Sequence, residues 1–296
     1  MNWAARWLNE AGHRWQDSGY PGLAGAAYAW AARLAPSWSV PWFNRGLLAK
    51  VERRWSDSLR FNRRAAELDP DDPPAWWNLG IAATATGQWK AARLAWTRYG
   101  IEIPPGEGPI EMDLGDVPIR IAPDSQAEVV WCRRIDPARA VVLSIPTAQS
   151  GHGCGDLILH DGAPTGSRRL GGREVPVFDE LEVLAPGKRH TFEVEVLAPG
   201  PADVADLETD QEDGVVAIED WSAMRRLCQR CDLGTPHDHP AAGPADEWRP
   251  VRVLGVAAES ERAARAAVDA WASRGPGRAF KTIECVLQRE DSKPSS

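Results

Sequence analysis

The densest group of metal-ligating side chains in this sequence is a pair of cysteines followed closely by a pair of histidines. Cys228 and Cys231 form a Cys-x2-Cys pair, and His237 and His239 follow it after a short turn that contains glycine and proline. Two thiolates and two imidazoles form the tetrahedral ligand set that zinc prefers, and four protein ligands make a closed, structural site. The sequence therefore predicts a structural zinc ion bound by these four residues.

Two further interpretations of the same residues stay open. Only five residues separate the cysteine pair from the histidine pair, whereas about 12 separate the pairs of a zinc finger. A cytosolic cysteine pair also serves as a redox centre, but a thioredoxin-like pair belongs to a β-α-β unit. Here we expect Cys228 near the end of a short helix over residues 221–230. The group is therefore a zinc site, a metal-free segment or a redox pair.

A second group that could carry chemistry contains His152, Cys154 and Asp156, with His160 and Asp161 shortly after them. Side chains two residues apart point to the same side of an extended segment, so the first three could converge. Converged, they would form a metal site or a Cys–His nucleophile pair. The interleaved glycines favour an ordinary loop that leads into a strand, because no further partners complete a catalytic set. We therefore predict no catalytic residues, and we keep an enzyme that uses His152 and Cys154 as a third interpretation of function.

The elements that position these groups follow a 34-residue repeat in the first third of the chain. Gly12, Gly46 and Gly80 are 34 residues apart. Further series with this spacing are Pro36, Pro70 and Pro104; Ala24, Ser58 and Ala92; and Ala31, Ala65 and Tyr99. Each copy is predicted to form two helices: a small residue lets the second helix approach the first, and proline ends the unit because it cannot continue a helix.

This pattern resembles the tetratricopeptide repeat, a helix–turn–helix unit of 34 residues. The third copy matches best, with Trp76 and Gly80 in the first helix and Ala92 and Trp96 in the second. The resemblance covers residues 5–104 and implies a helical solenoid of three repeats.

The second copy departs from the family pattern at two positions. Arg45 stands where the pattern has leucine, and Asn62 stands where it has an aromatic residue. Ala11 likewise replaces leucine in the first copy. These departures affect the packing of individual copies and leave the spacing that defines the repeat intact.

Members of this family generally hold peptide segments of other proteins on a concave surface lined by the first helix of each copy. The resemblance therefore implies a peptide-binding groove. Its predicted lining residues are Phe43, Asn44, Leu47, Lys50, Trp77, Asn78 and Ile81. An amide side chain offers a donor and an acceptor to a peptide backbone. The alternative is that the apolar members pack against neighbouring elements and that so short a solenoid serves as a docking or homo-oligomerisation surface.

The middle of the chain, residues 107–186, is predicted to form a small β barrel or sandwich. The expected strands are residues 117–121, 128–133, 140–145, 156–159 and 181–184, separated by turn signals.

Residues 187–290 contain two β-α-β units, which predict a ferredoxin-like α+β domain with its helices on one face of an antiparallel sheet. The first unit has strands at 191–197 and 215–218 around a helix over 202–212. The second has strands at 251–256 and 280–287 around a helix over 259–273. The Cys/His group at 221–240 lies between the units, and residues 291–296 are predicted to be a frayed tail.

Composition excludes several classes of protein. Hydrophobic residues make up 43% and charged residues 26% of the 296, which is ordinary for a globular protein. No apolar run approaches the ~20 residues that a bilayer span needs. The N-terminus lacks a secretory signal, so we expect a cytoplasmic protein. Five scattered cysteines do not suggest a disulfide framework.

Charge and tryptophan are unevenly distributed. Residues 1–106 hold 13 Lys and Arg against 9 Asp and Glu, although the whole chain has 34 against 42. The same residues hold 11 of the 15 tryptophans. This shift marks a domain boundary at residue 106, and the acidic remainder argues against a nucleic-acid partner. We interpret the five arginines between residues 53 and 64 as a solvated helix face rather than a nucleic-acid patch.

Together these features predict a multidomain protein of the α plus α+β class: a solenoid over 1–106, a small β domain and a ferredoxin-like domain. The predicted function is that of an adaptor whose solenoid binds another protein or peptide segment, without nucleic-acid or membrane partners. The alternative is a metalloprotein with structural zinc. No dinucleotide or phosphate-binding motif indicates an enzyme.

Overall fold

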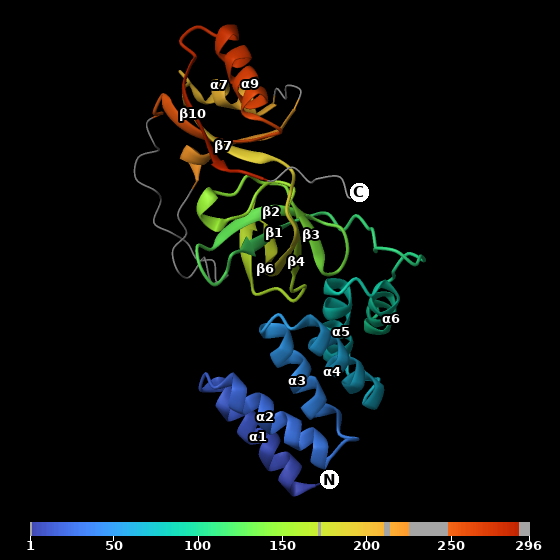
Figure 1. The fold of residues 1–296 in the computed structure, drawn as a ribbon. Coiled ribbons are helices and arrows are strands. Elements are labelled where there is room, and N and C mark those ends of the chain that lie inside the picture. The colour runs from blue at the N-terminus through green and yellow to red at the C-terminus, as the bar shows by residue number, and fades with distance from the viewer. Residues whose placement is uncertain (1, 171–172, 210–213, 225–247, 290–296) are drawn as a thin grey trace, which may run out of the picture. The chain divides into compact units, whose positions relative to one another are not determined.

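The computed structural model describes residues 2–170, 173–209, 214–224 and 248–289 (Figure 1). The chain divides into two compact units, one of residues 1–112 with 136–138 and one of residues 113–135 with 139–296. None of the helices in these described ranges combines the length and apolar character that a bilayer crossing requires. The zinc ligands predicted from the sequence, Cys228, Cys231, His237 and His239, lie outside the described residues.

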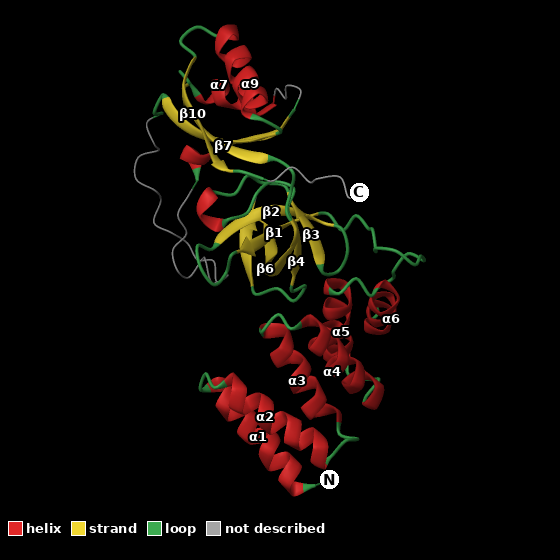
Figure 2. Ribbon diagram, in the orientation of Figure 1, coloured by secondary structure: helices red, strands yellow, loops and turns green. Residues whose placement is uncertain are grey.

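The first unit contains six helices that pair in chain order (Figure 2). They are α1 (Trp3–Asp17), α2 (Pro21–Leu34), α3 (Ser39–Val51), α4 (Trp55–Leu68), α5 (Pro73–Ala85) and α6 (Trp89–Tyr99). The helices of each predicted copy pack on each other, and α2 on α3 and α4 on α5 join neighbouring copies. The N-terminal third is therefore a stack of three helix pairs with the 34-residue spacing predicted from the sequence.

Close approach at one glycine in each repeat fixes the helix pairs. A Cβ atom on these glycines would lie 2.5 to 2.7 Å from a side chain of the second helix, closer than packed atoms come. The pairs are Gly12 with Tyr28, Gly46 with Asn62 and Gly80 with Trp96. The small-to-large contact survives in the second repeat even though Asn62 replaces the aromatic residue.

The second unit begins with six strands, five of which close into a barrel. The strands are β1 (Asp116–Ile121), β2 (Glu128–Arg134), β3 (Arg139–Val142), β4 (Leu157–His160), β5 (Gly166–Leu170) and β6 (Arg173–Ala185). Successive neighbours β1-β2-β3-β4-β6 are antiparallel, and β6 closes the barrel by pairing parallel to β1. A parallel closure is required here, because an antiparallel meander with an odd number of strands begins and ends in the same direction.

The expected strand at 181–184 is only the end of β6, which spans 13 residues. The first part of β6 forms a hairpin with β5, a strand that the sequence patterns did not indicate. The expected strand at 140–145 ends at Val142, and the chain continues into a loop with a short 3-10 helix, η1 (Ala148–Ser150). This loop carries the second candidate group and leads into β4.

The rest of the second unit is a four-stranded sheet with two helices on one face (Figure 2). Its elements are β7 (His190–Leu197), α7 (Pro201–Thr209), β8 (Val215–Asp220), β9 (Val251–Ala258), α9 (Glu261–Arg274) and β10 (Ala279–Leu287). The strand order is β10-β7-β9-β8 and every neighbouring pair is antiparallel. Both β-α-β units are present, and the ferredoxin-like assignment itself stays a prediction.

Alternating residues of the central strands form the core under the helices. Val194 and Val256 are fully buried against Trp271 of α9, whose ring nitrogen donates to the Asp203 carbonyl at 2.8 Å and so ties α9 to α7. The helix expected over 221–230 starts differently: residues Trp221–Ala223 form a single 3-10 turn, η2, and the chain is extended at Met224. The later part of that expected helix lies outside the described residues.

The barrel and the sheet are joined inside the second unit. The Trp221 ring packs on Gly255, where a Cβ would lie 2.4 Å from the ring, and its Nε1 donates to the Ile145 carbonyl at 2.9 Å. Ile145, Cys154 and Ala257 form a small apolar cluster with this ring. The helix-free face of the sheet is thus the face that receives the barrel loop.

Candidate functional site

The polar residues predicted for the groove form bridges between neighbouring repeats. The Asn44 side chain of α3 is buried, and its Nδ2 donates to Oδ1 of Asn9 on α1 at 2.9 Å. The same Nδ2 lies 3.2 Å from Nε2 of His13. One carboxamide of the second repeat therefore holds two side chains of the first, and it does so on the first helices.

A matching bridge joins the second repeat to the third. Lys50 Nζ of α3 donates to Oδ1 of Asn78 on α5 at 3.0 Å, and the two residues are 7% and 5% exposed. A buried ammonium group is costly unless it is hydrogen-bonded, so the Asn78 oxygen stabilises it. Asn44 and Asn78 occupy equivalent positions 34 residues apart.

Each bridge uses only one end of its carboxamide. Oδ1 of Asn44 and Nδ2 of Asn78 make no hydrogen bond to any described residue, and neither atom is sealed from solvent. The Asn44 oxygen is a hydrogen-bond acceptor, and the Asn78 nitrogen is a donor. Successive repeats thus present the two groups that the N–H and C=O of an extended peptide require.

The apolar members of the predicted groove differ in accessibility. Phe43, Leu47 and Trp77 are partly exposed, whereas Ile81 is 0% exposed and belongs to the core. The Trp77 ring packs against two rings of its own repeat. Its centroid lies 5.2 Å from that of Trp96 and 4.6 Å from that of Tyr99. Phe43, Leu47 and Trp77 are therefore the predicted apolar lining residues that keep part of their surface exposed.

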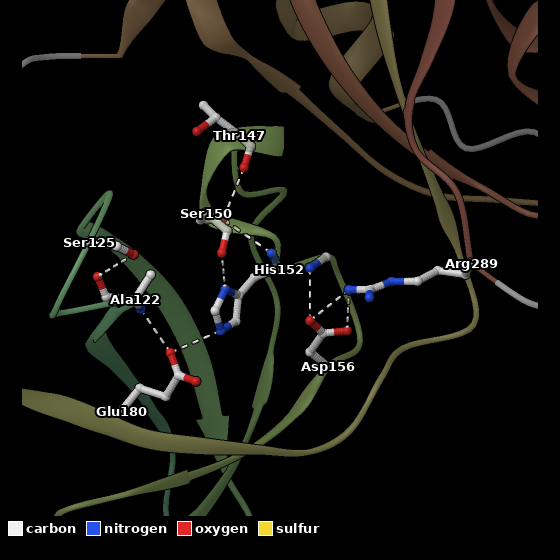
Figure 3. A network of polar contacts seen from close by, with 9 residues as sticks. Ala122, Ser125, Thr147, Ser150, His152, Asp156, Glu180 and Arg289 are labelled. Carbon is white, nitrogen blue, oxygen red and sulfur yellow. Dashed lines mark hydrogen bonds and ion pairs between the residues drawn. The ribbon is translucent and has the colours of Figure 1, made fainter.

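The second candidate group sits in the loop before β4, where His152 forms a buried ion pair that the sequence did not indicate (Figure 3). Its Nε2 lies 2.9 Å from Oε2 of Glu180 on β6, and its Nδ1 lies 2.8 Å from the Ser150 carbonyl. The Ser150 carbonyl only accepts hydrogen bonds, so Nδ1 donates to it, whereas Nε2 lies at ion-pair distance from the carboxylate without hydrogen-bond geometry. A buried carboxylate at this distance favours the charged imidazolium.

Electrostatics agrees with this assignment. Burial acts to lower the pKa of His152, but Glu180, the Ser150 carbonyl and the charge of Asp156 together outweigh it and the net pKa is raised. Glu180 Oε2 also accepts from the backbone nitrogen of Ala122 at 2.8 Å. Ala122 follows β1 with a φ of 46°, a left-handed conformation that costs energy for alanine. The carboxylate thus fixes two loops at once.

Asp156 points elsewhere and joins the barrel loop to the end of β10 (Figure 3). Its carboxylate, 1% exposed, accepts from the nitrogens of Gly153 at 2.9 Å and Gly187 at 2.6 Å. Arg289 Nη2 completes the set at 2.7 Å. The charge of a fully buried aspartate is therefore compensated by an arginine 133 residues away.

Cys154 makes no hydrogen bond to His152 or to Asp156. Its sulfur donates to the Leu143 carbonyl at 3.4 Å, and burial followed by the charge of Glu219 raises the pKa of the thiol to about 11. A thiol that stays protonated at neutral pH is a poor nucleophile. His160 is a core residue against Phe178, and burial lowers its pKa to about 3, so it is neutral.

His152, Cys154 and Asp156 therefore do not converge, contrary to the alternative based on an extended segment. The glycines turn the chain between them, and each side chain has a different partner. Within the described ranges, no three His, Cys, Asp or Glu side chains gather into a metal-binding group. The interpretation of this segment as a structural loop accounts for all its contacts.

No protein-family model matches this chain, and no curated protein matches its sequence. Solved structures resemble it over about a third of its length. One is the "Second TPR of Spaghetti (RPAP3) bound to HSP90 peptide SRMEEVD", at 17% identity, covering 32% of this chain and 89% of that chain with a TM-score of 0.31. A second is a mutant of the O-GlcNAc transferase of Thermobaculum terrenum, at 25% identity, covering 32% and 18% with a TM-score of 0.30. The CopN-Scc3 complex shows 20% identity, covering 33% and 60% with a TM-score of 0.30.

Proposed function

We propose that this chain is an interaction protein whose repeat solenoid binds an extended peptide segment of another protein. The observation that carries the proposal is the pair of carboxamides on α3 and α5. Each is held by a neighbouring repeat through one end, and each leaves its other end without a partner among the residues that the structure describes. A pre-oriented amide loses little conformational freedom when a ligand binds, which favours affinity.

In the proposed complex, Oδ1 of Asn44 accepts a hydrogen bond from a peptide N–H, and Nδ2 of Asn78 donates one to a peptide C=O. Phe43 and Leu47 supply apolar contact beside the first amide, and Trp77 does so beside the second. Such a surface recognises backbone and apolar side chains, so it suits many extended sequences rather than one charged motif. A dense basic set for a terminal carboxylate is absent from the residues predicted for the groove.

The experiment is a selection of peptides on the full chain, followed by affinity measurement on three proteins. Asn78→Ala removes the unused donor, and we expect it to weaken a selected peptide about tenfold, the loss expected for one hydrogen bond. Lys90→Ala, an exposed residue on the second helix of the same repeat, is the matched control and should leave affinity unchanged. Trp77→Ala is less informative, because that ring also packs on Trp96 and Tyr99.

Equal affinity of all peptides for the wild-type chain and Asn78→Ala would refute the groove. Thermal unfolding must accompany the measurement, since Asn78 also accepts from Lys50 and its loss lowers stability. Affinities are therefore compared well below both melting temperatures.

Structural zinc stays the alternative proposal. Its support is the ligand chemistry of Cys228, Cys231, His237 and His239, which supply the two sulfurs and two nitrogens of a closed tetrahedral site. We also propose that the four-stranded sheet adopts a ferredoxin-like fold, supported by its strand order and its two crossover helices.

A further inference from the structure

A cavity of about 220 Å³ lies in the first unit where the first two repeats meet, and no residue predicted for the groove lines it. Its walls come from α2, α3 and the start of α4. The lining residues are Gly25, Arg45, Leu48, Arg54, Asp57, Arg60 and Phe61. Three arginines against one aspartate give this small space an excess of positive charge.

Arg45 occupies a position that is apolar and buried in the other two repeats. The equivalent residues, Ala11 and Leu79, are 5% and 2% exposed. The Arg45 guanidinium is partly buried and stacks on two rings, 3.8 Å from the centroid of Phe61 and 5.1 Å from that of Trp42. A partly buried charge in place of a leucine costs stability when it forms no ion pair. An anionic ligand bound to Arg45 would offset that cost.

Asp57 acts on Arg45 only through space and forms no ion pair with it. The oxygens of Asp57 are taken by Arg54 and by Arg60, the latter through Nη2 at 2.8 Å. Arg54 also donates to Glu52, outside the cavity, at 2.8 Å. In the described part of the chain, Arg45 makes no hydrogen bond or ion pair, and Arg60 uses one of its nitrogens.

The neighbouring cations also act on Arg45. Burial and then the charge of Arg60 lower the pKa of the Arg45 guanidinium, Asp57 acts against them, and Arg54 lowers it further; the group nevertheless stays charged. Stacking on Phe61 holds the plane of the fork in place at a small cost in conformational freedom. The free donors of Arg45 are thus pre-organised beside an apolar wall of Leu48 and Phe61, and the more exposed Arg60, 4.5 Å from the Phe61 centroid, adds further donors at its edge.

We propose that this cavity binds a phosphate monoester. A phosphate monoester brings a charge of about −1.5 to −2 at pH 7 and three strong acceptor oxygens, and arginine forks bind it through paired N–H groups. A carboxylate would bring one charge, which Asp57 already supplies to this cluster. Leu48 and Phe61 would contact the carbon group that carries the phosphate. The site is separate from the groove of the proposed function and does not depend on it.

The test is calorimetric titration of the full chain with phenyl phosphate at low ionic strength. Arg45→Leu restores the residue of the third repeat, so we expect it to raise the melting temperature and to weaken phenyl phosphate binding at least about tenfold. Arg60→Gln should weaken binding in the same direction. Arg64→Leu removes one exposed positive charge from the same helix outside the cavity and should leave the affinity unchanged.

Several outcomes overturn the proposal. They are absence of phenyl phosphate binding to the wild-type chain, undiminished binding to Arg45→Leu, and a lower melting temperature of that variant. Benzoate places a single charge on the same ring and should bind more weakly, so equal affinity would overturn the assignment to a phosphate. Inorganic phosphate should also bind more weakly, and equal affinity would identify free phosphate as the ligand and overturn the ester.

Discussion

Replacing His152 by glutamine should destabilise the second unit, and by more at acidic than at alkaline pH. Both partners of the pair are buried, at 9% and 7% side-chain exposure. Removing one partner of a buried ion pair leaves the other charge uncompensated and typically costs about 3–5 kcal/mol. Glutamine can still donate one hydrogen bond to Glu180, so we expect the lower end, about 3 kcal/mol near pH 6.

The direction of the pH dependence follows from the raised pKa of His152. In the unfolded chain a histidine titrates near 6.5. A group whose folded pKa lies above that value contributes stability fully at pH values below it, and the contribution is lost as the pH rises through the folded pKa. Each pKa unit by which the folded value exceeds the unfolded value adds about 1.4 kcal/mol to the free energy of unfolding. The wild-type advantage over His152→Gln should therefore shrink between pH 6 and pH 9.

Urea unfolding of both proteins at pH 6 and pH 9 measures this difference. Glu180→Gln is the matched variant and should show the same trend, because it removes the other half of the pair. The double variant should be less destabilised than the sum of the two single variants, by about 1 kcal/mol or more. An equal loss for His152→Gln at both pH values, or a larger loss at pH 9, would refute the charged pair.

Two further predictions concern the repeats and the metal. Gly80→Ala would place a Cβ 2.7 Å from Trp96 and should cost about 1–3 kcal/mol by thermal unfolding. Gly22→Ala, with nothing within 4 Å, should be neutral or stabilising, and equal effects of the two would contradict the packing. Elemental analysis of protein purified without a histidine tag should find about one zinc ion per chain, lost with Cys228→Ser. A zinc content near zero and no change of melting temperature with a chelator would remove that proposal.

The solenoid could be predicted because the residues that pack its helix pairs recur in the sequence at a fixed spacing. Gly12, Gly46 and Gly80 recur every 34 residues, and each meets a side chain 16 residues later in the same repeat. Strand β7 could also be placed, because Val194 and Val196 alternate with more exposed residues, whereas β9 is marked by a continuous apolar run that is buried on both faces. Local patterns suffice where burial alternates along one element.

Two features could not be predicted for physical reasons. β5 and the start of β6 pair with each other outside the barrel, so polar residues occur on both faces and no alternation marks them. The His152–Glu180 pair joins a loop to a strand 28 residues away, and nothing in the sequence distinguishes Glu180 from a solvated strand residue. Its partner is set by the closure of the barrel, which is a tertiary property.

The polar bridges between the repeats fall between these cases. The repeat spacing places Asn44 and Asn78 on equivalent helix positions, and the sequence predicted both as backbone-binding groups. The spacing does not reveal that Asn9 and Lys50 hold one end of each carboxamide. Those contacts depend on how one repeat stacks on the next, and they decide which atoms stay available.

The most direct test of the interaction proposal is the affinity of a peptide selected on the full chain, measured by fluorescence anisotropy for the wild-type, Asn78→Ala and Lys90→Ala proteins. We predict that Asn78→Ala binds about tenfold more weakly and that Lys90→Ala binds as the wild-type chain does. Unchanged affinity of the Asn78→Ala protein, folded at the temperature of the measurement, would contradict a peptide site on the first helices of the repeats.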